Sequence, residues 1–503
     1  MTIRTAQQYL DSLKDDRDVW IEGERVADVT SDPRFAGAAQ TMADLLQMQH
    51  DPELSDLLTY PSPTTGERVG KTHLQPRSRD DLVARSEAIK AWMDATCGML
   101  GRSPDYKNVL VSSWAAAADA FTRPKFDGAA NMRAYHEYVR DNDLVMTHVL
   151  VNPQVDRSKP AHLEASDVTS QIVEETDAGI VIRGARMVAT LGALANELVV
   201  MPAASRWATN DTLDTTAFSF GFAIPIATPG LRLICRPPVA HLDARSAMDH
   251  PLSLRYDESD SMVIFDNVLV PWERVFIHRD PDFDSLVYRE TYTLHALLLQ
   301  SVIRAASKAE FMMALALSIA RSTKIDQHVP VQVMLAETIS IADFARTCRV
   351  AAEAEAQETP FGTWVPNIRP LQTWQTMFWK MYARQCEIIQ TLGAGGFVAV
   401  PSYAEVAGDM AGDVERYFQS ANADANSRVR LMRLAFDAAL SSFAGRQKLY
   451  EQYYTGDPMR TQAMLFSMFP KDPHLERIQA MLDDLEARQS PAGSPAGFRM
   501  AGE

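Results

Sequence analysis

The chain has 503 residues, of which 46% are hydrophobic and 23% are charged, as in ordinary globular proteins. Its 49 basic and 65 acidic residues give a net charge of −16, which argues against nucleic acid or an anionic membrane as the main partner. A chain of this length exceeds one simple core, so two or three structural domains are expected.

The N-terminal segment MTIRTAQQYL has no apolar leader, and no apolar stretch of about 18 residues is free of charge. Neither a signal peptide nor a transmembrane helix is therefore expected. The four cysteines lie far apart, and none forms a ligand pair with another cysteine or a histidine: Cys97, Cys235, Cys348 and Cys386. Reduced, mostly buried thiols fit a reducing compartment, so the expected location is the cytoplasm.

Residues 1–144 predict an N-terminal helical domain, because apolar residues recur at helical spacing over 38–48 and 79–100. Residues 145–280 predict a mostly antiparallel β domain, in the form of a barrel, because short runs rich in Val, Ile, Phe and Thr alternate with turn residues. Strands are expected at 145–151, 171–174, 179–190, 197–202, 217–226, 231–236 and 261–270.

Residues 281–488 predict a C-terminal four-helix bundle, from long segments at 283–324, 331–358, 370–392 and 425–454. The tail 489–503 repeats Pro-Ala-Gly and is expected to be flexible. This α+β order of helical domain, β domain and bundle resembles the acyl-CoA dehydrogenase-like fold. In that fold a flavin lies between the β domain and the bundle, and the protein is usually a tetramer.

Two common nucleotide-binding motifs are missing from the sequence. No GxGxxG opens a helix after a strand, and no GxxxxGK[ST] is present, so neither a Rossmann site nor a P-loop is expected. The glycine-rich stretch LGAGG at 392–396 follows a long helical pattern and predicts a helix end with a turn. Close approach of its backbone to a cofactor or to another subunit is the alternative.

The segment GRSPDYK at 101–107 predicts a turn that ends a helix and presents side chains on a loop. Arg102 offers a permanently charged donor fork, and the Tyr106 hydroxyl can donate to or accept from a phenolic oxygen. The alternative is a surface turn in which Arg102 pairs with Asp105.

His148 lies within the apolar strand pattern VMTHVLV, and a polar turn, NPQVDR, follows at 152–157. The ordinary pKa of histidine near 6.5 suits proton transfer with a phenol or a peroxide, although a lone His in such a strand can also be a satisfied core residue. This polar turn can form hydrogen bonds to a flavin ring or to its phosphates. Thr190 ends the strand GARMVAT, where its hydroxyl can reach a flavin or serve as an ordinary strand-end group.

The segment FAGRQKLYE at 443–451 interrupts a long helical pattern at Gly445 and Arg446. Glycine inside a helix costs about 1 kcal/mol relative to alanine, so packing or a ligand can require it there. The alternative for Arg446 is a solvated cation.

In the order in which they occur, these motifs together with DNVLVPWERV (266–275) resemble the oxygenase component of the 4-hydroxyphenylacetate 3-monooxygenase and chlorophenol monooxygenase family. The resemblance runs from about residue 6 to residue 485. It implies a two-component system in which a separate NAD(P)H:flavin reductase supplies FADH2, or FMNH2. Oxygen then adds to the flavin, and the C4a-hydroperoxyflavin hydroxylates a phenolic or related aromatic ring. A homotetramer, or a dimer, is also implied.

By this resemblance Arg102 and Tyr106 hold the phenol oxygen, while His148 stabilises the peroxide, helps to deprotonate the phenol and also contacts flavin. The other flavin-binding residues it implies are Gln154, Val155, Asp156, Arg157, Thr190, Phe443, Ala444, Gly445 and Arg446. Ala203 and Ala204 stand where relatives acting on 4-hydroxyphenylacetate often carry Ser or Thr, which places that substrate in doubt. The polar loop 205–216 is expected to close over the substrate.

Three rival hypotheses remain open. A 4-hydroxybutyryl-CoA dehydratase needs three cysteines and a histidine around an iron–sulfur cluster, and Cys97 has no second cysteine four residues on. An acyl-CoA dehydrogenase needs a glutamate base in the bundle, which the sequence does not single out. A flavin-binding scaffold without catalysis would have little use for Arg102, Tyr106 and His148.

Overall fold

The computed structural model describes residues 3–156, 158–159, 163–164, 167–202, 215–240, 242–243 and 246–489. The chain divides into two compact units, residues 1–455 and residues 456–503. The predicted boundaries at 144, 280 and 488 stay a prediction. Among the described helices, none combines the length and the apolar character that crossing a membrane requires.

The N-terminal part of the first unit is mainly helical, as expected. The helices predicted at 38–48 and 79–100 are confirmed as α2 (Ala36–Gln47) and α4 (Arg79–Ala95). The other helices before the bundle are α1 (Ala6–Ser12), α3 (Ser55–Leu58), α5 (Pro104–Ala116), α6 (Ala129–Asp141) and α7 (Ser253–Tyr256). Ser78 caps α4 by accepting from the Asp81 backbone N–H, which satisfies a donor that the first turn leaves open.

Strand β1 (Asp18–Ile21) was not expected in this helical region. It pairs in parallel with β12 (Leu231–Cys235) and antiparallel with β2 (Glu24–Arg25). The N-terminal segment therefore extends a sheet whose other strands come from the middle of the chain. Three short hairpins were also not predicted: β3 (Thr59–Pro61) with β4 (Arg68–Gly70), β5 (Thr122–Arg123) with β6 (Phe126–Asp127), and β15 (Gln357–Glu358) with β16 (Trp364–Val365).

Each of the seven predicted strand segments contains a strand, and two sheets result. The six-stranded sheet has the order β2-β1-β12-β13-β9-β8, and the four-stranded sheet has the order β14-β11-β10-β7. Pairing is antiparallel except for β1 with β12 and β10 with β7. The remaining strands are β7 (Met146–Val149), β8 (Gln171–Thr176), β9 (Gly179–Thr190), β10 (Glu197–Val200), β11 (Phe220–Pro225), β13 (Asp260–Pro271) and β14 (Val275–His278).

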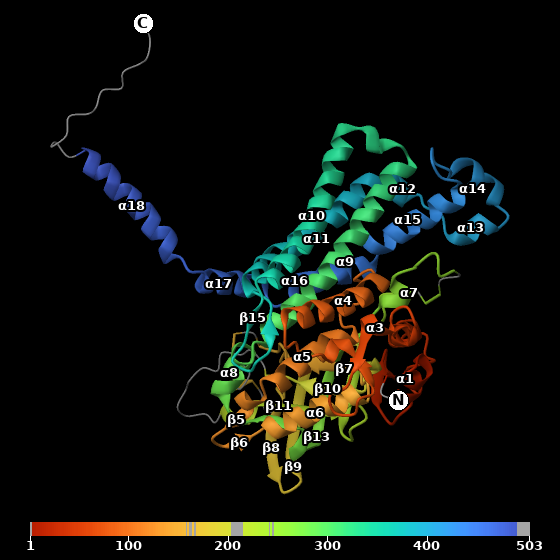
Figure 1. Cartoon of the computed structure of the whole chain (residues 1–503). Helices are drawn as coiled ribbons and strands as arrows, with labels where there is room; N and C mark the ends of the chain where they lie inside the picture. The colour runs from red at the N-terminus through yellow and green to blue at the C-terminus, as the bar shows by residue number, and fades with distance from the viewer. Residues whose placement is uncertain are drawn as a thin grey trace. The chain divides into compact units, whose positions relative to one another are not determined.

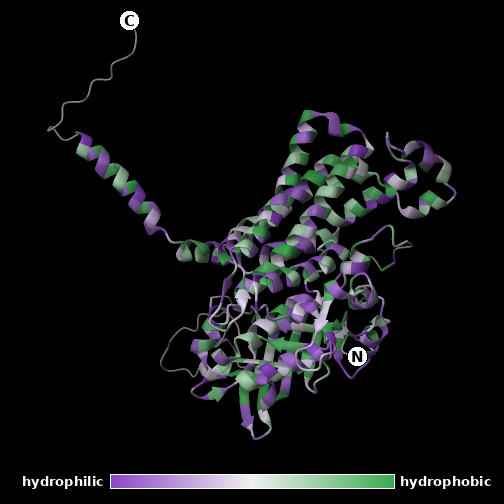
Figure 2. Ribbon diagram, in the orientation of Figure 1, coloured by the Kyte–Doolittle hydropathy of each residue, from purple (hydrophilic) through white to green (hydrophobic). Residues whose placement is uncertain are grey.

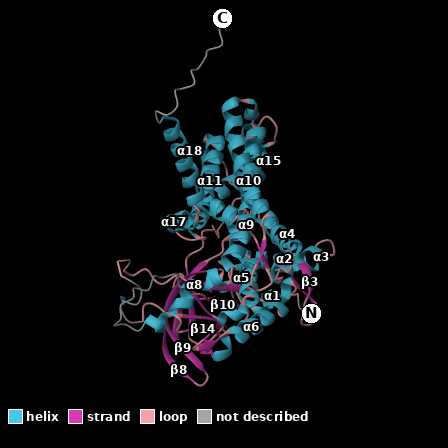
Figure 3. Ribbon diagram, turned by 60° about the vertical axis from the view of Figure 1, so that its left-hand side comes forward, coloured by secondary structure: helices cyan, strands magenta, loops and turns pink. Residues whose placement is uncertain are grey.

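Alternation of side chains explains why the long central strand forms. In β13, Val263, Phe265, Val268 and Val270 are at most 1% exposed, and the residues between them are more exposed. This period of two, shifted by one residue at the irregularity between Phe265 and Val268, buries one face of the sheet, as a half-covered strand requires. Figure 3 shows the strands gathered at one end of the first unit and the long helices at the other.

The bundle is built on α9 (Thr293–Ser322), which contacts α10 (Val329–Ala354), α11 (Ile368–Gly393) and α15 (Ala425–Ala439). These helices run side by side in Figure 1. The predicted apolar stripe of α9 is buried from Leu298 to Ala316, as the helical period demands. The glycine-rich stretch after α11 ends that helix at Gly393 and starts the short α12 (Gly395–Val398), as expected.

Two of the predicted bundle helices are broken. The segment 283–324 contains most of α8 (Pro281–Glu290) and then α9, with Tyr292 in the left-handed region at φ 56° between them. The segment 425–454 divides into α15 and α16 (Ser442–Tyr453), because Ser441 caps a new helix by accepting from the Ala444 N–H. The interruption thus falls four residues before Gly445. The short helices α13 (Tyr403–Ala407) and α14 (Ala411–Tyr417) lie between α12 and α15.

The second unit contains α17 (Pro458–Met468) and α18 (Asp472–Gln489). Apolar and polar residues alternate along α18 in Figure 2. Within the unit as described, its large apolar side chains are exposed: Leu475, Ile478, Met481, Leu482 and Leu485.

Candidate active site

The segment 101–107 differs from the predicted loop, because helix α5 begins within it at Pro104. Proline is favoured in the first helical turn, where its missing N–H costs no bond. Only residues 101–103 form the turn, and Tyr106 and Lys107 lie in the first turn of α5. Their side chains are therefore fixed by a helix packed in the core rather than carried on a mobile surface loop.

Arg102, Tyr106 and His148 come together as predicted. The guanidinium carbon of Arg102 lies 4.2 Å from the ring centre of Tyr106, and the rings of Tyr106 and His148 are 5.9 Å apart. The alternative, an exposed turn with Arg102 paired to Asp105, is wrong. Asp105 is fully buried, and its Oδ2 accepts a hydrogen bond of 2.7 Å from the Gln300 side-chain amide.

His148 projects from β7 opposite Val199 of β10 and is 6% exposed. Its Nδ1 is buried and has no hydrogen-bond partner in the part of the chain that the structure describes. Burial, together with the charges of Lys107 and Arg102, lowers the pKa of His148 well below its usual value. The imidazole is therefore neutral near neutral pH.

Lys107 is a member of this cluster that the sequence analysis did not single out. It is 2% exposed, its Nζ lies 4.3 Å from the Tyr106 ring centre, and among the described residues its Nζ donates to the Met201 thioether at 3.7 Å. Burial and the nearby Arg102 lower the pKa of Lys107 well below its usual value. A buried lysine without a carboxylate partner among the described residues is costly, which marks this position as a site for an incoming anion or dipole.

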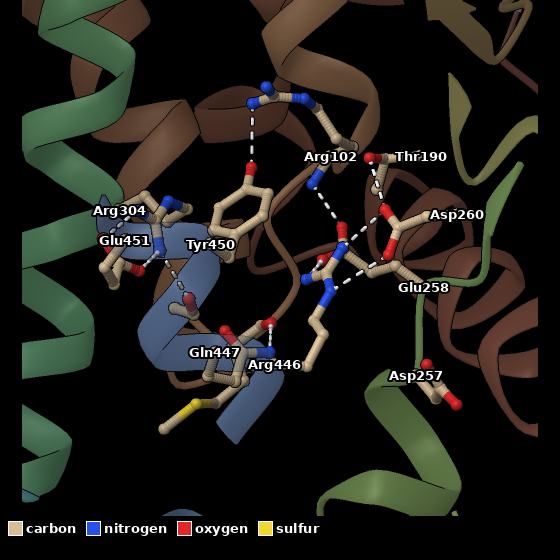
Figure 4. A network of polar contacts seen from close by, with 12 residues as sticks. Arg102, Thr190, Asp257, Glu258, Asp260, Arg304, Arg446, Gln447, Tyr450 and Glu451 are labelled. Atoms are coloured by element: carbon tan, nitrogen blue, oxygen red, sulfur yellow. Dashed lines mark hydrogen bonds and ion pairs between the residues drawn. The ribbon is translucent and has the colours of Figure 1, made fainter. Parts of the chain in front are cut away.

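A second part of the site joins the bundle to the β-sheet (Figure 4). Arg446 donates 2.6 Å to Glu258 and 2.9 Å to Asp260, and the Thr190 hydroxyl donates 2.7 Å to the same Asp260 oxygen. Arg236 also pairs with Asp260 at 3.0 Å. Although burial opposes ionisation, Arg446 and Arg236 hold the pKa of Asp260 well below its usual value. Arg446 is thus not a solvated cation.

The end of β9 that carries Thr190 is irregular. Val188 has φ 70° and forms a bulge where the register between β9 and β13 shifts, and Leu191 has φ 59°. A bulge re-aims the side chains that follow it and is common beside functional sites. Here it directs Thr190 toward Asp260 and thus toward Arg446.

The predicted flavin-binding turn follows β7. Val151, just before the turn, bridges to Met187 of β9, so the turn starts beside the strand that ends at Thr190. Val155 is 69% exposed, and the hydrogen bond from Ser158 lowers the pKa of Asp156 to about 2. Gln154 lies in the same turn without regular structure, and Arg157 lies outside the described residues.

Three of the predicted cofactor-binding positions lie at the start of α16. Phe443 and Ala444 are each 1% exposed, with Phe443 packed in the main core. At Gly445, apart from its two neighbours and the backbone of its own helix, no atom of the described chain lies within 4 Å of where a Cβ would stand. The chain's own packing therefore does not require glycine there, which leaves the ligand explanation in place. Ala203 and Ala204 lie outside the described residues.

Helix α16 also takes part in a fully buried ion cluster, of which Figure 4 shows Arg304, Gln447 and Glu451. Glu451 accepts from Arg304 at 2.6 and 2.8 Å and from Lys308 at 2.6 Å, and Gln447 accepts from Lys308 at 2.7 Å. Burial opposes the ionisation of Glu451, yet the two cations lower its pKa to about 2. These bonds fix α16 against α9. Among the described residues, no group of three or more His, Cys, Asp or Glu side chains could hold a metal ion.

Comparison with known proteins identifies the class. The family model for the N-terminal part of 4-hydroxyphenylacetate 3-hydroxylase matches residues 5–277, and that for its C-terminal part matches residues 285–483. Together with the arginine–tyrosine–histidine cluster, these matches define a monooxygenase of acyl-CoA dehydrogenase-like fold. The chain belongs to the 4-hydroxyphenylacetate 3-hydroxylase family, which confirms the resemblance seen in the sequence.

Individual relatives cover almost the whole chain. The 4-hydroxyphenylacetate 3-monooxygenase oxygenase component of Thermus thermophilus is 38% identical over 96% of this chain and 98% of its own. The 4-nitrophenol 2-monooxygenase oxygenase component of a Rhodococcus species is 34% identical over 90% of this chain and 86% of its own.

The solved structures agree in fold. A crystal structure of the oxygenase component of 4-hydroxyphenylacetate 3-monooxygenase, complexed with FAD and 4-hydroxyphenylacetate, superposes with a TM-score of 0.91 at 38% identity, covering 96% of this chain and 99% of its own. The archaeal 4-hydroxybutyryl-CoA dehydratase from N. maritimus has a TM-score of 0.83 at 18% identity over 98% of this chain and 97% of its own. That distant likeness concerns the fold alone.

Proposed function

We propose that this chain is the oxygenase component of a two-component system that hydroxylates a phenolic or related aromatic ring. The observation that carries the proposal is the close packing of Arg102 with the buried Tyr106 and His148 in a member of this family. A separate NAD(P)H:flavin reductase supplies FADH2, or FMNH2, and O2 is the second substrate. The working assembly is a homotetramer or a dimer.

The residues present fit a flavin. The Arg102 Nε and the His148 Nδ1 are buried without partners among the described residues, and the helix surface at Gly445 is open. In our proposal, the polar turn, the end of β9 and the start of α16 hold the cofactor: Gln154, Val155, Asp156, Arg157, Thr190, Phe443, Ala444, Gly445 and Arg446. Reduced flavin, when bound, supplies the two electrons that allow one oxygen atom of O2 to enter the ring.

The chain itself positions the substrate and moves a proton. The Arg102 guanidinium and the Tyr106 hydroxyl hold the phenol oxygen, and the positive charge of Arg102 favours the phenolate form, which makes the ring more electron-rich. The neutral His148 accepts the phenol proton at a ring nitrogen. Because His148, Lys107 and Arg102 lie in a buried region, water is kept from the reacting atoms.

A substrate screen tests the proposal. The purified chain is supplied with NADH, FAD, a generic flavin reductase and one compound at a time from a panel of simple phenols, chlorophenols, nitrophenols, phenolic acids and heteroaromatics. The expected result is an O2-dependent product heavier by one oxygen atom, or an oxygen-for-substituent exchange in a halogenated or nitrated ring. The same assay without the chain is the control. If no member of the panel yields such a product, the proposal is wrong.

A further inference from the structure

The side chain of Arg102 is held from the opposite end of the sequence. Its Nη1 donates a hydrogen bond of 2.8 Å to the hydroxyl of Tyr450, which lies on α16, 348 residues away (Figure 4). Its backbone N–H donates 2.6 Å to Glu258. One bond thus fixes the backbone of the turn, and the other fixes the direction of the guanidinium.

Tyr450 is itself tightly held. Its ring stacks on Tyr454 with centres 4.6 Å apart and planes at 10°, and the guanidinium carbon of Arg446 lies 4.7 Å from its centre. Arg304 lies 5.4 Å from the same ring and is bound to Glu451 in the buried ion cluster. A ring with such neighbours has little freedom, so its hydroxyl presents a fixed acceptor to Arg102.

Gly101 is shaped to fit Tyr450. A Cβ built at Gly101 would lie 2.3 Å from the Tyr450 Cζ and 2.4 Å from its hydroxyl oxygen, far inside contact distance. Any other residue at 101 would therefore displace the tyrosine ring or the turn. The glycine that opens the GRSPDYK segment leaves space for the tyrosine near the end of FAGRQKLYE. This fit is a physical reason for the two segments to occur together.

We propose that Tyr450 is a positioning residue that sets the guanidinium of Arg102 for the phenol oxygen, with Gly101 as its required partner. The inference rests on the proposed function, since it assigns Arg102 to the phenol. Tyr450 acts through Arg102. The Tyr450 hydroxyl accepts a hydrogen bond from Nη1 of Arg102, and this bond directs the unpartnered Nε and the rest of the guanidinium toward Tyr106. Loss of the Tyr450 hydroxyl leaves the positive charge of Arg102 in place but no longer fixes the orientation of its guanidinium.

The test uses Tyr450→Phe, which removes the hydroxyl and keeps the ring against Gly101. Tyr454→Phe is the matched control, because it removes a neighbouring hydroxyl that donates to Ser301 at 3.4 Å instead of accepting from Arg102. Binding of 4-nitrophenol and 4-hydroxyphenylacetate to the full chain is measured by calorimetry. We expect about tenfold weaker binding for Tyr450→Phe, as a lost hydrogen bond to a charged group implies, and less than twofold change for Tyr454→Phe.

A spectroscopic readout separates positioning from a loss of structure. The guanidinium favours the phenolate, so bound 4-nitrophenol ionises at a lower pH than the free probe, and its absorbance reports this. In Tyr450→Phe the ionisation of the bound probe should move back toward that of the free probe, with an unchanged thermal midpoint. An unchanged ionisation, or equal effects of the two Tyr→Phe variants, would overturn the inference.

A double variant shows whether Tyr450 acts through Arg102. In an Arg102→Gln background, Tyr450→Phe should weaken binding less than twofold further, because the group that it positions is gone. In the wild-type background, Gly101→Ala should weaken probe binding as much as Tyr450→Phe does. In the Arg102→Gln background, Gly101→Ala should have no further effect on binding. Equal losses in both backgrounds would contradict the inference alone. A substrate screen that yields no hydroxylated product from any phenol would instead overturn the proposed function itself.

Discussion

Thr190 and Arg446 donate hydrogen bonds to the same carboxylate oxygen, Oδ1 of Asp260, at 2.7 and 2.9 Å. The first comes from the end of strand β9 and the second from helix α16, so one carboxylate joins the sheet to the bundle. The two predicted flavin-binding residues therefore meet, although 256 positions separate them in the chain (446 − 190).

Loss of Arg446 should destabilise the fold. Arg446→Gln leaves Glu258 and Asp260 without their main counter-charge, and breaking a largely buried pair costs roughly 3 kcal/mol. Urea unfolding should show a loss of about that size. Arg346→Gln, which breaks an exposed pair with Asp343, is the control and should change stability by less than about 0.5 kcal/mol. Equal effects would contradict the structural role of the Arg446 pairs.

Replacement of His148 should separate oxygen consumption from hydroxylation. In His148→Ala the phenol loses its proton acceptor, so product formation should fall by about two orders of magnitude or more while hydrogen peroxide is still released. Product mass and peroxide are measured in the same reaction. His474→Ala, at an exposed position in α18, should leave coupling unchanged. A fully coupled His148→Ala enzyme would remove this residue from the mechanism.

Lys107 should set the acid limb of the pH profile. Burial lowers the pKa of His148 first, and the charges of Lys107 and Arg102 lower it further. Lys107→Met removes one of these charges, so His148 becomes protonated at higher pH. Because the neutral imidazole is the active form, the acid limb of kcat/KM should move to higher pH. The exposed Lys125→Met serves as the control, and an acid limb that stays in place or moves down would contradict the argument.

Asp105 should make stability depend on pH. Burial raises its pKa from 3.8 to about 6, so the folded chain favours the protonated acid. The stability that the raised pKa of Asp105 gives to the folded state is fully present below pH 3.8, and it is lost as the pH rises through about 6. Asp105→Asn mimics the protonated acid, so it should match the wild type at pH 4 and exceed it by about 2–3 kcal/mol at pH 7. Urea unfolding at both pH values measures this, with Asp343→Asn as the exposed control.

Much of the architecture follows from periodicity. The alternating pattern of residues 261–270 and the helical stripe of α9 each bury one face, so strand and helix could both be predicted from local sequence. Strand β1 could not, because four residues of mixed polarity become a strand only through their partner β12. The break before α16 was misplaced, since the cap at Ser441 outweighed the glycine at 445.

The candidate site was predicted in part. The sequence motifs named Arg102, Tyr106 and His148, which the structure brings together. The sequence alone could not show that Glu258 and Asp260 neutralise the charge of Arg446, because long-range ion pairs leave no periodic signal. The acidic run DESD at 257–260, directly before a predicted strand, was the available sign. Lys107 and Tyr450 stood inside motifs already quoted, but only packing shows what they touch.

The fit between Gly101 and Tyr450 has an evolutionary consequence. Two positions that share one volume cannot drift independently: a larger residue at 101 must be accompanied by a smaller one at 450, or by a turn of different path. Among family members, the two positions should therefore change together. A subgroup that has lost both would have had to evolve another way of orienting its arginine, and would be a natural place to look for altered substrate range.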